Sequence, residues 1–80
     1  MNEEIVKAGQ AAKLLLQNPT LQEAFQTIED ALTEQWRNTA SPNDREEVWY
    51  TLKGLERFRS ILTATVESGE LEQQLGERYE

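Results

Sequence analysis

The sequence contains no cysteine and no histidine. The absence of cysteine excludes a disulfide and fits a reducing compartment. Without both residues the chain lacks the ligands of the usual zinc site and the Ser-His or Cys-His pairs of nucleophilic catalysis. It also lacks a glycine-rich phosphate loop, and the polar residues of segment 41–44 do not have the spacing of a calcium loop. We therefore expect neither a metal nor a cofactor.

Long apolar runs are absent as well. The longest is Leu14-Leu15-Leu16, far short of the roughly 20 residues that cross a bilayer. The first nine residues, MNEEIVKAG, have no apolar stretch of the kind found in a signal peptide. We therefore expect no membrane segment and no secretory leader.

The balance of charge is strongly acidic, at −7 over 80 residues, although Lys53, Arg57 and Arg59 make one stretch locally basic. An acidic surface repels phosphate backbones and anionic lipids, which argues against direct nucleic-acid or membrane binding. The length allows one domain, residues 1–80. Only 38% of residues are hydrophobic and 29% are charged, a lean core for a chain of this size. We therefore expect a homo-oligomer in which part of the core forms between chains.

Apolar spacings of three and four residues predict a first helix over 3–17 and a second over 19–38. Asn18 and Pro19 separate them, since Asn is a good N-cap and Pro fits the first helical position. After a turn at 39–43, acidic residues open a third helix, predicted over about 43–68. Gly69 is predicted to end it as the residue after the C-cap. Leu71 and Leu75, one helical turn apart, allow another short helix in 70–80, but Gly76 and the charge favour a tail that frays.

A short turn between two long helices predicts an antiparallel hairpin. We therefore expect an all-α fold, in which a hairpin of two long helices is preceded by a short N-terminal helix. The apolar stripe of the third helix is wider than a two-helix contact requires. Part of it is predicted to form an interface between chains, and the residues divided between the two contacts are Leu52, Leu55, Phe58, Ile61, Leu62 and Val66.

Gly54 lies in the middle of that helix, where it costs about 1 kcal/mol relative to alanine. Two interpretations stay open: it lets a bulky neighbour such as Trp36 lie against the backbone, or it is neutral. Carboxylates are plentiful, but general acid–base catalysis needs a pair held in a cleft, and three narrow helices offer little cleft. We therefore expect no catalytic residues and no enzyme.

Arginines and aromatic residues flank the predicted turn. Arg45 precedes Trp49 by one helical turn, which suggests either a cation–π contact or a capping salt bridge, and Arg37 follows Trp36. One interpretation is that the arginines pin the turn and cover the tryptophans. The other is that they bind a small anionic ligand such as a nucleotide, with Arg37, Arg45, Trp49, Lys53 and Arg57 as the candidate residues. For the basic residues of the third helix, pairing with acidic faces between subunits is the simpler alternative.

One set of residues carries a likeness to known proteins: Asn18-Pro19, Phe25, Trp36-Arg37-Asn38-Thr39, Arg45-Glu46, Trp49, Leu52-Lys53, Leu55 and Ser68-Gly69-Glu70-Leu71. In this pattern the chain resembles a family of small, mostly uncharacterised helical proteins of tailed bacteriophages, chiefly short-tailed ones. The resemblance covers about residues 5–72. The chain departs from the pattern at Glu47 and at Thr51, where an apolar residue is expected. The resemblance implies a phage origin and a location in the host cytoplasm or the virion.

Three functional hypotheses follow. The first is a non-enzymatic interaction protein, an oligomer that serves as a minor virion, head-assembly or accessory component. The second is an anti-defence protein that sequesters a host signalling nucleotide. The third is an acidic inhibitor that occupies a basic surface of a host protein.

Overall fold

The computed structural model describes residues 2–79, and all regular structure in this range is helical. α1 spans Glu3–Gln17, α2 spans Pro19–Asn38 and α3 spans Pro42–Tyr79. The all-α prediction is therefore confirmed. The finer description, a hairpin preceded by a short helix, is not confirmed. α1 has the predicted bounds, but with 15 residues it is not a short helix. Met1 and Glu80, the first and last residues of the predicted domain, lie outside the described residues.

Asparagine side chains begin the first two helices. The Oδ1 atom of Asn2 accepts hydrogen bonds from the backbone amides of Glu4 and Ile5, at 3.0 and 3.4 Å. Asn18 does the same for Thr20 and Leu21, at 2.9 and 3.2 Å. Its extended backbone ends α1, and the following proline occupies the start of α2. Both caps satisfy amides that the first helical turn leaves without partners. The cap at Asn18 therefore explains why the chain bends between α1 and α2 instead of continuing as one helix.

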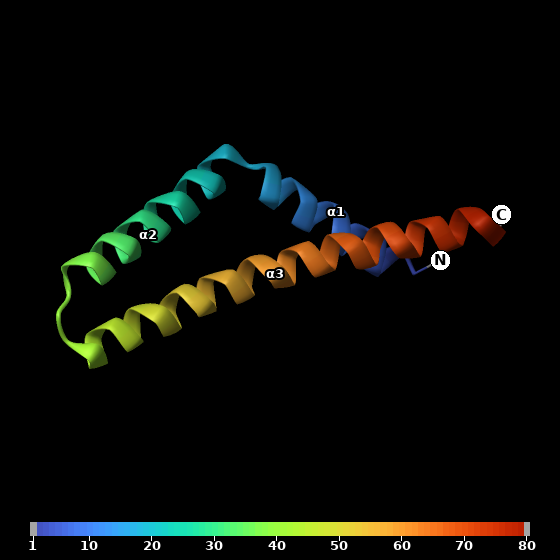
Figure 1. Ribbon diagram of the computed structural model, residues 1–80. Coiled ribbons are helices and arrows are strands. Elements are labelled where there is room, and N and C mark those ends of the chain that lie inside the picture. The colour runs from blue at the N-terminus through green and yellow to red at the C-terminus, as the bar shows by residue number, and fades with distance from the viewer. Residues whose placement is uncertain (1, 80) are drawn as a thin grey trace.

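The three helices form an elongated, open arrangement around α3 (Figure 1). α1 and α2 make a bent arm that runs back along α3, so the beginning of the chain lies near the end of α3. The backbone amide of Asn2 donates to Glu72 Oε1 at 2.6 Å, which ties the two ends together. The bend between α1 and α2 stands away from α3 (Figure 1). On the two sides of this bend, α1 packs on the C-terminal half of α3 and α2 packs on the N-terminal half.

The prediction that α3 ends near Ser68 is wrong, and so is the predicted tail. α3 continues without a break to Tyr79, and no described glycine has a positive φ. A glycine that ends a helix normally adopts the left-handed conformation. Gly69 instead lies against Gly9 of α1, where a Cβ atom built on either residue would come within 2.8–2.9 Å of the other's Cα. Gly69 therefore permits close contact between two helices and does not stop one. The start at Pro42 is one residue earlier than predicted.

Little apolar surface is enclosed by this arrangement. The buried apolar side chains are those of Ala12, Phe25 and Val48, with exposed fractions of 4, 7 and 2%. The molecule measures 60 × 23 × 15 Å along its principal axes. The fold is therefore elongated and thin, with a small core.

Candidate functional site

Eight residues follow one another along the exposed side of α3 at alternating spacings of three and four. We call them the outer seam: Tyr50, Gly54, Arg57, Ile61, Ala64, Ser68, Leu71 and Leu75. This spacing keeps the residues on one side of a helix, as in the contact line of a coiled coil. All eight are exposed, and the large apolar members are exposed by 38–60%. Arg57 carries the seam's only charge. The seam is thus an apolar row that the chain itself leaves uncovered.

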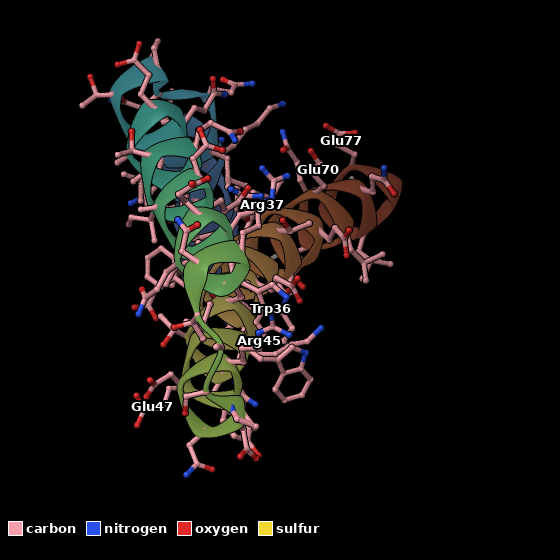
Figure 2. All side chains as sticks on the ribbon, turned by 60° about the vertical axis from the view of Figure 1, so that its left-hand side comes forward. Trp36, Arg37, Arg45, Glu47, Glu70 and Glu77 are labelled. Atoms are coloured by element: carbon pink, nitrogen blue, oxygen red, sulfur yellow. The ribbon has the colours of Figure 1, made fainter. Side chains whose placement is uncertain are left out.

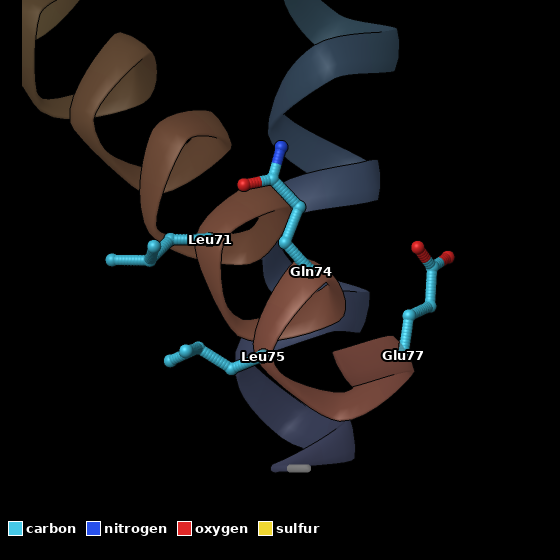
Figure 3. Close-up of a pocket in the computed structure, with 4 residues that line it drawn as sticks. All are labelled: Leu71, Gln74, Leu75 and Glu77. Atoms are coloured by element: carbon cyan, nitrogen blue, oxygen red, sulfur yellow. The ribbon is translucent and has the colours of Figure 1, made fainter. Parts of the chain in front are cut away.

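The C-terminal end of the outer seam can be followed in Figure 3. Leu71 and Leu75 point to the same side of α3, whereas Glu77 points to the other side. The two leucines line a shallow depression on the helix surface together with Gln74 and Glu77. The last two turns of α3 therefore extend the apolar row beyond the point where the predicted helix ended.

Two shallow grooves flank the contact between Gly9 and Gly69. The apolar one combines α1 residues with part of the outer seam, and its lining is Ile5, Ala8, Ile61, Ala64, Thr65 and Ser68. The other is more polar and includes Lys13 and Glu70, whose charged atoms are 4.0 Å apart. α1 thus adds apolar surface to the same side of α3 that carries Ile61 and Ala64. The polar residues lie on the opposite side of the glycine contact.

The structure divides the six predicted interface residues into two groups. The half-buried ones are Leu52, Leu55, Leu62 and Val66. The other two remain exposed, Phe58 by 53% and Ile61 by 57%, although the Phe58 ring also lies 5.7 Å from that of Phe25. Of the six, only Ile61 belongs to the outer seam.

The sequence prediction missed Tyr50, Leu71 and Leu75 as surface candidates. For the two leucines the cause is the false helix end at Gly69, which placed them in a tail. Their spacing of one helical turn, in step with Ile61, was the available signal. The predicted apolar stripe of the third helix did not include Tyr50.

The turn between α2 and α3 is held by Arg45. Its Nε atom donates to the Thr39 carbonyl at 2.7 Å, and its guanidinium carbon lies 5.6 Å from the centre of the Trp36 ring (Figure 2). The suggested contact between Arg45 and Trp49 is therefore wrong. Arg37 is exposed and lies apart from the Trp36–Arg45 pair (Figure 2).

The remaining candidate ligand residues have separate surroundings. The Lys53 ammonium lies 5.4 Å from the centre of the Trp49 ring, and Trp49 meets Tyr50 edge to face at 5.1 Å. Lys53 also pairs with Glu56 at 3.3 Å. Arg57 lies in the outer seam, more than one helical turn further along α3. Of the five residues proposed as a nucleotide site, Lys53 and Trp49 contact each other, whereas Arg45 contacts Trp36 of α2.

Gly54 does not make room for a bulky neighbour such as Trp36. A Cβ atom built there meets no atom of the chain within 4 Å, so neither Trp36 nor any other described side chain lies against it. By contrast, glycine is required at positions 9 and 69, because a Cβ atom on either residue would lie less than 3 Å from the backbone of the other. Nothing within one chain explains the glycine at 54.

No polar or charged side chain that the structure describes is buried, and residues 2–79 contain no cluster of three or more acidic side chains placed to hold a metal ion. In the same range, none of the helices has both the length and the apolar character needed to span a bilayer. No protein-family model, curated protein or solved structure matches the chain.

Proposed function

We propose that this protein is a non-enzymatic helical interaction protein that works as a homo-oligomer. The observation that carries the proposal is the contrast between its small enclosed core and its uncovered apolar side chains. Among the side chains that the structure describes, three apolar ones are buried, whereas the large apolar ones left exposed are Ile5, Leu14, Leu15, Ile28, Trp36, Trp49, Tyr50, Phe58, Ile61, Leu71 and Leu75. Exposed apolar side chains in this number, against so small an enclosed core, favour a surface that is covered by another protein.

The elongated shape supports the same conclusion. Domains generally bury their helices between packed layers, whereas this chain extends over 60 Å and encloses little apolar surface. In this proposal the antiparallel hairpin of α2 and α3, extended by α1, is half of a core, and another chain provides the second layer. The folded protomer is then inseparable from its association, as in obligate dimers.

The cellular role is proposed from the resemblance to small proteins of tailed phages. We place the oligomer in the virion or the host cytoplasm, as a minor virion, head-assembly or accessory component. The lack of histidine and cysteine supports a binding role over catalysis, because these residues serve most often as general base and thiol nucleophile. Its partners are then other copies of itself and, beyond these, virion or host proteins.

Light scattering coupled to size-exclusion chromatography tests the self-association. We expect the wild-type chain to elute as an oligomer, and Ile61→Glu to shift it towards monomer because the substitution places a charge in the uncovered apolar row. Thr63→Glu is the matched control, since Thr63 is exposed on the same helix but outside that row. A wild-type monomer throughout the micromolar to millimolar range would overturn the proposal. Equal behaviour of the two variants would show that another surface is used.

The virion role has its own test. Mass spectrometry of purified particles from a phage that encodes this protein is expected to detect it at low copy number. Its absence from intact particles and from assembly intermediates would remove the virion and head-assembly roles and leave an accessory role in the host.

A further inference from the structure

We propose that the outer seam of α3 pairs with the outer seam of a second copy, with the two helices antiparallel and the two-fold axis at the level of Leu62 and Thr63. This inference rests on the proposed function, because it requires self-association. It adds the surface used, the direction of the partner helix and the residues that meet.

The outer seam has the spacing that a partner helix of the same kind requires. Alternating steps of three and four residues bring a helix's side chains into the gaps of a second helix with the same repeat. From Tyr50 to Leu75 the row is about 38 Å long at ~1.5 Å per residue. A second copy supplies a row of equal length and equal repeat, which makes it the occupant that the pattern fits.

The sizes of the side chains select an antiparallel arrangement. In the proposed register Ile61 faces Ala64 of the second copy, and Gly54 faces Leu71 of the second copy. Tyr50 and Leu75 meet in the same way at the two ends. A large residue thus stands opposite a small one in the inner layers, which is how facing positions fill space without voids. Parallel helices in register would instead bring Gly54 against Gly54 and leave a gap.

Arg57 fixes the register. In the proposed pairing its guanidinium faces the Ser68 hydroxyl of the second copy, with the exposed carboxylate of Glu67 next to it in sequence. A shift by one heptad places Arg57 against Ile61 in one direction and against Leu75 in the other. A guanidinium enclosed by an apolar side chain has no hydrogen-bond acceptor, and a parallel pair would oppose two like charges. Of the registers compared, the proposed one therefore gives Arg57, the only charged residue of the seam, a hydrogen-bond acceptor.

The glycine at 54 is an independent observation that points to the same partner. Its missing side chain has no counterpart within the chain, because an added Cβ meets nothing within 4 Å. Opposite Leu71 of a second copy, the same position becomes the small member of a large–small pair. Leu71 in turn is 57% exposed in the single chain and points outward from α3 (Figure 3).

Cross-linking through introduced cysteines tests the pairing directly, since the natural chain has none. Gly54→Cys and Leu71→Cys are prepared with tags of different mass, mixed and treated with a short bis-maleimide reagent. We expect the mixed pair to link at least tenfold more than either variant links with itself. In the antiparallel register identical positions are separated by 17 residues, about 25 Å along the axis. Thr63→Cys, exposed outside the seam, is the control and is expected not to link.

A second pair, Tyr50→Cys with Leu75→Cys, repeats the test at the ends of the seam in case a substitution in the middle disturbs folding. Circular dichroism and light scattering of each variant accompany the reaction. Self-linking of Leu71→Cys at the level of the mixture, in a sample that scatters as an oligomer, would mean parallel helices and overturn this inference while leaving the proposed function intact. Links through Thr63→Cys alone would also overturn it, by assigning another face. No link together with the mass of a monomer would overturn both.

Discussion

The contact between Gly9 and Gly69 gives the sharpest quantitative prediction about the fold. In Gly69→Ala the new Cβ would lie 2.9 Å from the Cα of Gly9 and 3.1 Å from the carbonyl oxygen of Ile5. Carbon atoms in contact normally lie about 3.5–4.0 Å apart. Both obstructing atoms belong to a helix backbone and cannot rotate away. The substitution therefore forces α1 and α3 apart by a large fraction of an ångström.

The magnitude follows from two opposed effects. Overpacking a close contact typically costs about 1–3 kcal/mol, and the upper part of that range, about 2–3 kcal/mol, applies here because the obstructing atoms are backbone. Alanine recovers about 1 kcal/mol relative to glycine within a helix. We expect the net free energy of unfolding of Gly69→Ala to fall by about 1–2 kcal/mol, and the melting temperature to fall by roughly 5–15 °C for a chain of this size. Gly9→Ala acts on the same contact, so the double variant is expected to lose less than the sum of the two single losses.

Urea unfolding followed by circular dichroism measures these differences, at one fixed protomer concentration because the protein is proposed to associate. Gly54→Ala is the matched control. It adds the same methyl group to the same helix, but no atom of the chain lies within 4 Å. It therefore gains up to about 1 kcal/mol, less any cost of the methyl group against a second copy. The reasoning about the glycine contact is refuted if Gly69→Ala is as stable as the wild type or more stable.

Four further substitutions test how the arm and the turn are held. Asn18→Ala removes the acceptor of two amide hydrogen bonds at the start of α2 and is expected to lower the free energy of unfolding by about 0.5–2 kcal/mol in urea titrations; no change would mean that solvent replaces the cap. Arg45→Ala is expected to shift tryptophan fluorescence to longer wavelength, because the guanidinium covers Trp36, and an unaltered spectrum would count against that contact. Glu29→Gln breaks a partly exposed ion pair with Arg59 and is expected to change stability by less than about 1 kcal/mol. Arg59→Ala is expected to cost more, since its guanidinium also lies over an aromatic ring, and equal losses from the two would contradict this.

Local signals were sufficient to predict α1 and α2. Asn18 and Pro19 act within a few residues of where they stand, so a cap and a helix start can be read without knowing the rest of the fold. The end of α3 could not be predicted in this way. A glycine after an apolar stripe is typical of a helix end, but it is also typical of close helix packing, and only the position of Gly9 decides between them.

The candidate surface was predictable in kind but not in its residues. The excess of apolar positions on the third helix indicated that part of its stripe would stay uncovered. Which side is covered depends on where α1 and α2 dock, and that is a tertiary property. As a result Leu52 and Leu62 became half-buried, whereas Leu71 and Leu75, assigned to a tail, proved to be part of the exposed row.

In the proposed pairing, the outer seam of α3 is covered by the same seam of another copy. Nuclear Overhauser effects between isotope-labelled and unlabelled copies in a mixed sample test it most directly. Tyr50 and Leu75 are about 38 Å apart along one helix, too far for such an effect within a chain. In the antiparallel pairing we expect cross-peaks between the Tyr50 ring of one copy and the Leu75 methyl groups of the other. A sample with the mass of an oligomer that lacks these cross-peaks, and has them instead between identical residues, would contradict it.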